Sequence, residues 1–388
     1  MRILSELSAW YPHYTTSSLG LILEQLKPIF KRNNIHMDIC SPAGGDINVM
    51  NPQLVRYFRK NKFFYHFIRR IYFWEKAYRY TIRNIENYDL FWIHNPNPFI
   101  WRKINSKFLN KIIITQHCTF YGVSKTSPYN GMIPKIYFHF MSKLEKQFIK
   151  NIRVTTNEII AISPTIKKEL EELGVDEKNV LYIPNGVDIH KFRPASIPER
   201  KEFRKKIGIP EDSIIFLTVG QLIESKHPIN LIKTFKNLSK KFTNVYLIII
   251  GKGEMKTQID TIITNFPNVF LIEFLPFSEI NEYYNCADYY ITASTYEGQS
   301  LALLEAMSSG LPCITSNIST FNSIIRKANC GITLNFDSSD LSNKILIDFF
   351  KNHDKQKLGE NAREFVKKYH SWDKISKEYI KLFERIIR

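Results

Sequence analysis

The feature that most constrains the fold is an alternation of short apolar runs with longer segments of helical periodicity. It continues along the whole chain of 388 residues. Short runs separated by helix-length segments are typical of parallel sheets built from β-α units. The sequence predicts strands in the first half at 2–7, 36–40, 90–94, 111–116, 158–162 and 180–183, and in the second half at 214–220, 245–251, 269–274, 289–293 and 312–316.

The two sets of strands predict two domains. A chain of this length exceeds what one hydrophobic core usually serves. The segment 192–198 between the sets contains Pro194 and Pro198, which disfavour both helix and strand, so we expect a linker there. The pattern therefore predicts an α/β protein with two open sheets facing each other across a cleft. Ligands of such sheets bind outside the carboxyl ends of the strands.

Composition limits the class of protein. Apolar residues make up 44% of the chain, but no run reaches the roughly 18 apolar residues of a membrane-spanning helix. The first residues lack the features of a secretory signal, so we expect a cytoplasmic protein. The five cysteines are scattered and never spaced as C-x-x-C, which fits a reducing compartment, predicts buried and unreactive thiols, and offers no metal site.

A pair of glutamates follows the predicted strand 289–293. Glu297 lies in a loop before Gly298, and Glu305 lies more than one turn into a helix that begins near Ser300. The free N–H groups at that helix start favour a bound anion. Either glutamate alone is more simply interpreted as a surface residue, whereas two carboxylates at this spacing can contact different parts of one elongated ligand.

Two further turns follow predicted strands. Gly220 and Gln221 lead to Lys226, which can neutralise a diphosphate, although a solvated surface lysine is the commoner case. Asn185 and Gly186 form a tight turn at the end of the first domain, which we interpret mainly as architectural.

In this order and spacing, these elements resemble the family 4 retaining glycosyltransferases of the GT-B fold, over nearly the whole chain. The resemblance implies two Rossmann-like domains. The first, 1–192, would bind the acceptor and be completed by a C-terminal helix, 372–388, that crosses back to it. The second, 193–371, would bind a nucleotide-sugar.

The resemblance also implies roles for individual residues. His117, Lys226 and Glu297 would be catalytic, with Lys226 holding the departing diphosphate and Glu305 bonding the ribose. Donor-binding positions would be Gly220, Gln221, Lys226, Gly251, Leu275, Glu297, Gly298, Gln299, Ser300, Leu301 and Glu305. Acceptor or cleft positions would be Ser17, Ser18, His94, Ser163 and Asn185. For His117 alone a core or surface role is the alternative, and helix capping explains Ser163 equally well.

The chain departs from the family pattern at two places. Gln221 stands where the family usually has an arginine, so one fixed cation beside the diphosphate is missing. The segment around Ser17 and Ser18 has serines where the family has a glycine pair. We find no Asp-x-Asp pair, which favours a mechanism without metal or other cofactor, in which Lys226 and the helix N-terminus stabilise the leaving group.

Residues 54–83 hold nine Lys or Arg, eleven aromatic residues and only one acidic residue, Glu75, within a chain of formal net charge +17. Helical spacing places a cationic face, with Tyr65, Tyr72, Phe73 and Tyr80 interleaved, opposite an apolar face of Phe63, Phe67, Ile71, Trp74 and Tyr78. A cationic, aromatic face suits an anionic membrane surface, and a solvated face without function is the alternative. The membrane-facing residues would be Lys62, Arg69, Arg70, Lys76, Arg79 and Arg83.

The sequence thus predicts a metal-independent glycosyltransferase that moves a hexose or N-acetylhexosamine from a UDP-sugar, or next from GDP-mannose, to a glycan acceptor. We expect a lipid-linked acceptor used in bacterial surface polysaccharide or lipopolysaccharide synthesis, reached from the inner face of the cell membrane. The alternative is a non-catalytic GT-B subunit that binds a sugar nucleotide or a partner enzyme at the membrane. Nucleic-acid binding is not expected, because no recognisable nucleic-acid-binding motif accompanies the basic segment.

Overall fold

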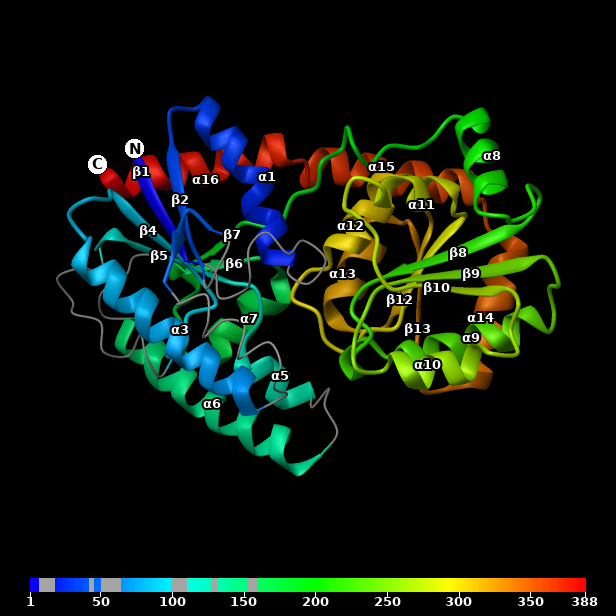
Figure 1. Ribbon diagram of the computed structural model, residues 1–388, viewed down its shortest axis with the longest axis horizontal. Helices are drawn as coiled ribbons and strands as arrows, with labels where there is room; N and C mark the ends of the chain where they lie inside the picture. The colour runs from blue at the N-terminus through cyan, green and yellow to red at the C-terminus, as the bar shows by residue number, and fades with distance from the viewer. Residues whose placement is uncertain (7–17, 42–44, 50–63, 99–109, 127–130, 153–158) are drawn as a thin grey trace. The chain divides into compact units, whose positions relative to one another are not determined.

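A computed structural model describes residues 1–6, 18–41, 45–49, 64–98, 110–126, 131–152 and 159–388. The chain forms two compact units, one of Met1–Asn185 with Trp372–Arg388 and one of Gly186–Ser371 (Figure 1). The junction therefore lies before the segment 192–198 that the sequence suggests as a linker. In that segment, Ser196 caps helix α8 (Ile197–Lys206) and Pro198 lies in its first turn, so this proline helps to begin a helix.

The first unit contains a parallel sheet with the strand order β3-β2-β1-β4-β5-β6-β7 in the described residues. All six strands predicted for this half are confirmed, with ends that differ by at most two residues, and β3 is additional. The strands are β1 (Arg2–Glu6), β2 (His36–Ser41), β3 (Ile47–Asn48), β4 (Leu90–His94), β5 (Ile112–Gln116), β6 (Ile159–Ala161) and β7 (Val180–Tyr182).

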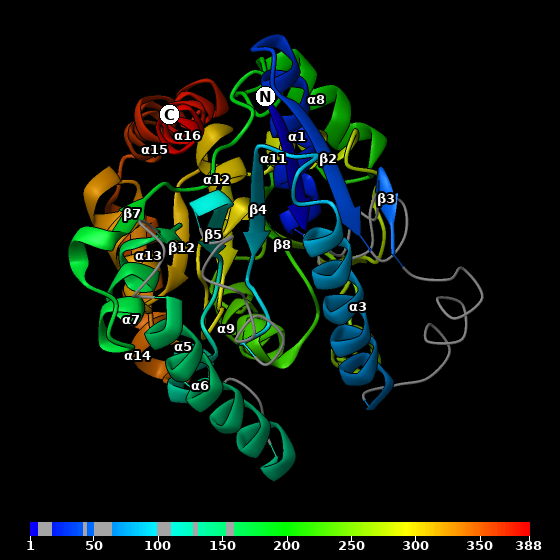
Figure 2. The ribbon, with the colours of Figure 1, turned by 90° about the vertical axis from the view of Figure 1, so that its left-hand side faces the viewer.

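Helices cover both faces of this sheet (Figures 1 and 2). Alternate residues of a strand point to opposite faces of the sheet, so the side chains of β4 pack against helices on both faces. The helices described in this unit are α1 (Ser18–Arg32), α3 (Phe64–Arg83), α5 (Phe120–Thr126), α6 (Met132–Ile152), α7 (Pro164–Glu172) and α16 (Trp372–Ile387), with a 3₁₀ turn, η2, at Glu177–Asn179.

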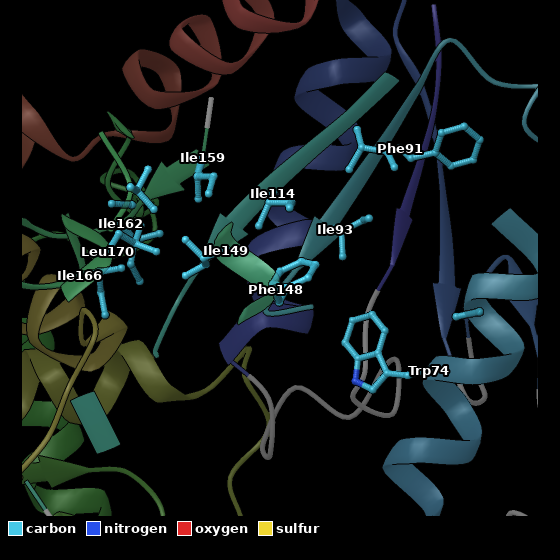
Figure 3. Packing of buried hydrophobic residues seen from close by; sticks show 14 of the residues in the cluster. Trp74, Phe91, Ile93, Ile114, Phe148, Ile149, Ile159, Ile162, Ile166 and Leu170 are labelled. Carbon is cyan, nitrogen blue, oxygen red and sulfur yellow. The ribbon is translucent and has the colours of Figure 1, made fainter. Parts of the chain in front are cut away.

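The core on one face joins β4 and β5 to α3, α6 and α7 (Figure 3). Phe91 and Ile93 of β4 are completely buried there against apolar side chains of the three helices. The helix residues that Figure 3 labels in this cluster are Trp74, Phe148, Ile149, Ile166 and Leu170.

On the opposite face, the buried ring of Trp92 packs against α1 and α16. Its ring centroid lies 6.2 Å from that of Phe30, 4.7 Å from that of Tyr379 and 5.5 Å from that of Phe383. The indole N–H of Trp372, at the start of α16, donates to Oε1 of Gln25 in α1. The helix 372–388 thus completes the first unit by packing on α1.

The structure of helix α3 corrects the predicted assignment of its residues to a cationic face and an apolar face. Phe73, expected on the cationic face, is 1% exposed and packs beside Trp74 in the core, with Ala77 and Thr81 also buried. The buried face of α3 is therefore rotated toward the positions expected to be cationic. Tyr78, expected in the core, is only partly buried.

The second unit contains a parallel sheet with the order β10-β9-β8-β11-β12-β13. All five strands predicted for this half are confirmed, and β13 is additional. The strands are β8 (Ile214–Val219), β9 (Val245–Ile250), β10 (Val269–Ile272), β11 (Tyr289–Thr292), β12 (Cys313–Ser316) and β13 (Gly331–Leu334). Together the two sheets confirm the predicted α/β class with two Rossmann-like domains.

The remaining helices belong to this second unit and surround its sheet in Figure 1. Its core is formed by apolar residues of β8, β9 and β11 with α9 and α14. Besides α8, the helices are α9 (Pro228–Ser239), α10 (Lys256–Ile263), α11 (Ile280–Cys286), α12 (Leu301–Ser308), α13 (Ser319–Ala328), α14 (Ser339–Asn352) and α15 (Lys355–Tyr369), with a 3₁₀ turn, η3, at Glu224–Lys226.

Membrane-spanning helices and cysteine burial were also considered in the sequence. Among the described residues, no helix is both long and apolar enough to cross a membrane. Cys40, Cys286, Cys313 and Cys330 are buried as expected, but Cys118 is exposed, because it lies in the loop after β5 rather than on a strand.

Candidate active site

The second unit has a topological switch point between β8 and β11. These two strands are neighbours at the centre of the sheet, and the chain continues outward from them in opposite directions. Ligands of open α/β sheets bind at the carboxyl ends of such strands, where the connecting loops separate. The loop after β8 carries Lys226 and the loop after β11 carries Glu297, so the two predicted catalytic residues of this unit lie at its switch point.

Lys226 and Glu297 form an ion pair, in which the lysine ammonium donates to Oε1 of the carboxylate. Their side chains are 27% and 14% exposed, so the pair is accessible but partly shielded from water. The backbone N–H of Thr295 donates to the carbonyl of Ser225 over 2.9 Å, which holds the two loops together beside the pair.

Two hydroxyl groups fix Glu297 further. Ser294 donates to Oε1 of Glu297 over 3.2 Å. Thr320, at the start of α13, donates to the backbone carbonyl of Glu297 over 2.8 Å. The carboxylate is therefore oriented by its own loop and by the helix that follows β12, and it is not a free surface group.

Glycines let the loops after β8 and β9 approach closely. A Cβ atom on Gly251 would lie 1.7 Å from the carbonyl oxygen of Gly220, and one on Gly253 would lie 2.2 Å from that of Leu222. The N–H groups of Gly220 and Leu222 donate across this contact to Ile250 and Lys252. Only residues without a side chain fit here, so Gly251 shapes the wall of the candidate site.

The N-terminus of α12 lies in the loop that carries Glu297. Ser300 is its N-cap, with the hydroxyl accepting a hydrogen bond from the N–H of Leu303 over 3.2 Å. The first turn carries no acidic side chain. Gly298 is buried and Gln299 is half-buried just before the cap. The positive end of the helix dipole is therefore not neutralised by a carboxylate of its own first turn.

Glu305 is buried, at 6% exposure, in the middle of α12. The hydroxyl of Tyr284 donates to its Oε2 over 2.7 Å. Burial raises the pKa of Glu305 to about 7, partly offset by the Tyr284 hydrogen bond and by the charge of Lys191. The carboxyl group thus changes charge near neutral pH, which the sequence does not predict.

Lys191 joins this cluster from the segment after the Asn185 turn. Its ammonium donates to the carbonyl of Phe277 and lies over the Phe277 ring. Burial lowers the pKa of Lys191, while the charges of Glu305 and Asp188 act in the opposite direction. Sequence reasoning missed Lys191 and Tyr284.

In the first unit, the two predicted histidines contact one another at the ends of β4 and β5. Nδ1 of His94 lies 3.0 Å from Nε2 of His117, and Nε2 of His94 lies 3.2 Å from the hydroxyl of Ser5. Burial lowers the pKa of His117 to about 4 and that of His94 well below its ordinary value. Both rings are therefore neutral at physiological pH, and a neutral pair can relay a hydrogen bond.

Asn95 holds the loop of His117 in place. Its side-chain oxygen accepts from the N–H of His117 over 2.6 Å and from that of Cys118 over 3.3 Å. The backbone of Asn95 is left-handed, with φ 48°, a conformation that asparagine tolerates better than most residues. Asn95 is a further residue of this site that the sequence reasoning missed, although it directly follows His94.

The remaining predicted positions differ in how far they are buried. Gln221 is exposed at the end of β8, Leu275 and Leu301 are 9% exposed, and Asn185 is 4% exposed. Ser163 is buried and caps α7 by accepting from the N–H of Ile166 over 3.2 Å, as the capping alternative predicts.

Several predicted residues lie partly or wholly outside the described part of the chain. Ser17 and Lys62 lie outside it, Ser18 is described only as the first residue of α1, and for Arg69 and Arg70 only the helical backbone is described. The described residues hold no cluster of His, Cys, Asp and Glu that could bind a metal ion.

The family described as Glycosyltransferase Family 4 matches residues 23–191, and the family described as Glycosyl transferases group 1 matches residues 199–365. The chain belongs to glycosyltransferase family 4. This glycosyltransferase therefore carries two family domains, and each of them contains some of the predicted site residues.

Several curated proteins are similar in sequence to this glycosyltransferase. An uncharacterised glycosyltransferase of Methanocaldococcus jannaschii is 28% identical over 295 residues, which cover 74% of the chain and 71% of that protein. The Escherichia coli UDP-Gal:alpha-D-GlcNAc-diphosphoundecaprenol alpha-1,3-galactosyltransferase is 30% identical, covering 44% of the chain and 45% of that protein. The alpha-monoglucosyldiacylglycerol synthase of Acholeplasma laidlawii is 28% identical, covering 51% and 54%.

Solved structures show the same GT-B fold over the full length of this glycosyltransferase. Sucrose-phosphate synthase from Thermosynechococcus elongatus has a TM-score of 0.76 at 17% identity, covering 99% of the chain and 98% of that protein. HepE from Anabaena, in complex with UDP-glucose, has a TM-score of 0.70 at 15% identity, covering 99% and 100%. At these identities the likeness establishes the fold.

Proposed function

We propose that this glycosyltransferase moves a hexose or N-acetylhexosamine from a UDP-sugar to a lipid-linked glycan acceptor, with retention of the anomeric configuration and without a metal ion. GDP-mannose is the second candidate donor. The observation that carries the proposal is the ion pair of Lys226 and Glu297 at the switch point between β8 and β11. A lysine there can accept a diphosphate as an alternative partner to Glu297.

In the proposed donor complex, the diphosphate lies between the ammonium of Lys226 and the N–H groups at the start of α12. Once the donor is bound, both groups face the diphosphate, so they can stabilise the negative charge that grows as the nucleotide departs. When Lys226 turns to the diphosphate, Glu297 is released toward the hydroxyl groups of the donor sugar. Glu305, farther along α12, would bond the ribose hydroxyls.

We assign His117 and His94 to the acceptor side of the reaction. Nε2 of His117 faces Nδ1 of His94. Because both rings are neutral, Nδ1 of His117 can donate a hydrogen bond to a sugar hydroxyl or accept one, according to its tautomer. Asn95 fixes its backbone. The roles of Gly220, Gly251, Gly298 and Ser300 are to bring loop backbone close to the donor, as their positions at the strand ends allow.

Two relatives support the choice of donor and acceptor. The Escherichia coli enzyme is named for UDP-Gal and a diphosphoundecaprenol-linked acceptor, and the Acholeplasma enzyme for a glucosyl-diacylglycerol product. A lipid-linked acceptor fits the exposed cations of α3, where Arg79 and Arg83 reach solvent and Lys76 is half-buried. We therefore extend the proposal to association with an anionic membrane surface, in surface polysaccharide or lipopolysaccharide synthesis.

The test is transfer or hydrolysis of radiolabelled UDP-glucose, UDP-galactose, UDP-N-acetylglucosamine and GDP-mannose by the purified protein, with and without bacterial lipid extract. We expect activity with a UDP-sugar that falls at least ~10²-fold in Lys226→Ala, the scale for loss of a group that stabilises the transition state. Lys233→Ala, on the neighbouring helix α9, is the control. Binding of UDP without any turnover would instead favour a non-catalytic subunit.

A further inference from the structure

Helix α6 carries an exposed apolar cluster in its first nine residues. The side chains are Met132, Ile133, Ile136 and Phe140, which are 76%, 72%, 62% and 55% exposed. These are four of the ten large apolar residues exposed in the described part of the chain, and they are gathered within about two and a half turns of one helix. Single exposed apolar residues are common, but a contiguous cluster of this kind marks an interaction surface.

The four side chains share a face of α6. At about 100° per residue they fall within a sector of about 100°. Met141, Phe148 and Ile149 fall on the opposite side and are 3%, 2% and 1% exposed. Phe148 and Ile149 pack in the core of the first unit (Figure 3). The helix is thus anchored by one face of its second half, while its first half extends beyond the sheet (Figure 2).

The cluster is bordered by positive charge. Lys135, Lys143 and Lys146 are exposed on the same helix, together with His139. The single carboxylate of α6, Glu145, is 2% exposed and accepts a hydrogen bond from the N–H of Tyr121, so it does not oppose these charges at the surface. An exposed apolar face with lysines along its edge matches a bilayer interface, where apolar side chains enter the acyl boundary and lysines meet anionic headgroups.

Helix α3 supplies charge but not this apolar contact. Phe73 and Trp74 are buried in the core, and no large apolar side chain is exposed among those described in α3. The start of α3 lies on the same side of the first unit as the start of α6, toward the bottom of Figure 2. A membrane approaching that side would meet the apolar side chains and the lysines of α6, whereas Arg79 and Arg83 lie in the last two turns of α3, at its other end.

We propose that the first half of α6 inserts Met132, Ile133, Ile136 and Phe140 into the interface of an anionic lipid bilayer and is the apolar anchor of this glycosyltransferase. The proposal rests on the proposed function in naming the lipid surface as a partner. It adds which residues enter the bilayer. Charge complementarity selects an anionic bilayer over a second copy of this chain, since two copies would bring their lysines together.

The test is co-sedimentation of the full chain with vesicles of phosphatidylcholine alone or with 30% phosphatidylglycerol. The wild type should bind the anionic vesicles, and less tightly as salt is raised. The triple variant Ile133→Ser, Ile136→Ser, Phe140→Ser should bind about tenfold or more weakly, because apolar burial contributes to such binding. The matched control is Ile197→Ser, Ile345→Ser, Ile387→Ser, which removes three side chains 72%, 40% and 43% exposed elsewhere and should bind as the wild type does.

A second readout reports insertion directly. In Phe140→Trp, tryptophan emission should shift to shorter wavelength with anionic vesicles, whereas Ile197→Trp should show no shift. Unchanged binding of the α6 triple variant, or absence of wild-type binding to anionic vesicles, would overturn the proposal. A wild-type dimer in sedimentation velocity that the triple variant abolishes, with vesicle binding unaffected, would identify a second copy as the partner instead.

Donor hydrolysis in detergent separates this inference from the proposed function. If the α6 triple variant hydrolyses a UDP-sugar at the wild-type rate but loses vesicle binding, the proposed function and the α6 anchor are both supported. If wild type binds vesicles through α6 but neither transfers nor hydrolyses any sugar nucleotide, the proposed reaction fails and the anchor remains.

Discussion

The ammonium of Lys226 donates a hydrogen bond to Oε1 of Glu297 across the switch point of the second sheet. The two residues come from different loops, 71 positions apart in the chain. In the absence of donor, the cation assigned to the diphosphate is therefore already neutralised by the carboxylate assigned to the sugar. Donor binding has to replace one partner of Lys226 with another.

This relationship predicts opposite effects of one substitution on binding and on turnover. Glu297→Gln removes the charge that competes for Lys226, so UDP should bind several-fold more tightly, on the scale of a partly exposed ion pair. Turnover of the nucleotide-sugar should fall, because the amide cannot act as a carboxylate beside the sugar. Isothermal titration with UDP and steady-state rates measure the two effects. Weaker UDP binding would show that Glu297 contacts the nucleotide itself.

A substitution of Gln221 is predicted to strengthen nucleotide binding rather than weaken it. Gln221 is exposed in the loop after β8, the loop that also carries Lys226. Gln221→Arg should tighten UDP binding by about two- to tenfold, with stronger salt dependence, because a second cation adds attraction that ions screen. Thermal shifts with UDP at low and high salt would measure it. Unchanged affinity would mean that this loop does not approach the diphosphate.

The contact between the β8 and β9 loops predicts a large difference between two glycines. Gly251→Ala would place Cβ 1.7 Å from the carbonyl oxygen of Gly220, so the loops must separate. We expect a loss of about 2–4 kcal/mol in the free energy of unfolding, the range for serious backbone or packing strain. Gly220→Ala has no atom within 4 Å of the added methyl and should be close to wild type in urea unfolding. Equal stabilities would contradict the contact.

Glu6 predicts how stability depends on pH. It is completely buried at the end of β1, accepts a hydrogen bond from Thr81, and burial raises its pKa to about 8 from an ordinary value of 4.5. Below pH 4.5 the carboxyl is protonated in both folded and unfolded chains, so its contribution to stability is fully present. As pH rises from 4.5 to about 8, unfolding releases a proton and that contribution is lost.

Glu6→Gln keeps the shape of the neutral carboxyl without a titrating group. Relative to this variant, the wild type should lose on the order of a few kcal/mol of unfolding free energy between pH 4.5 and pH 8, since each pKa unit corresponds to about 1.4 kcal/mol. Glu145, whose pKa is also raised to about 8 by burial, remains in both proteins, so the difference isolates Glu6. Parallel stability curves across this range would show that Glu6 is ionised in the folded chain.

Much of the fold could be predicted from sequence because buried parallel strands are continuous apolar runs. The runs at 90–94 and 245–251 correspond to β4 and β9, whose residues are buried except for half-buried Tyr246. The strands β3 and β13 were not predicted. Both lie at sheet edges, where Ile47–Asn48 and Gly331–Leu334 are short and only partly buried, so their sequences carry a weak apolar signal.

The site could be predicted only in part, since sequence spacing shows which residues follow strands but not which side chains contact one another. Glu297 and Lys226 both follow central strands, and their nearness is a consequence of strand order. The burial of Glu305 under Tyr284, and of Phe73 in the core, depends on packing between helices and sheet that no local pattern contains. The same is true of the contact between His94 and His117.

The packing of α16 on α1 and Trp92 has a consequence during synthesis. The ribosome makes the first sheet early, but the Tyr379 and Phe383 rings that cover Trp92 are translated only after the entire second unit. Until then, one face of the first sheet presents uncovered aromatic surface in a nascent chain, the kind of surface that chaperones recognise. The second unit, continuous in sequence, can fold first, and the first unit closes last.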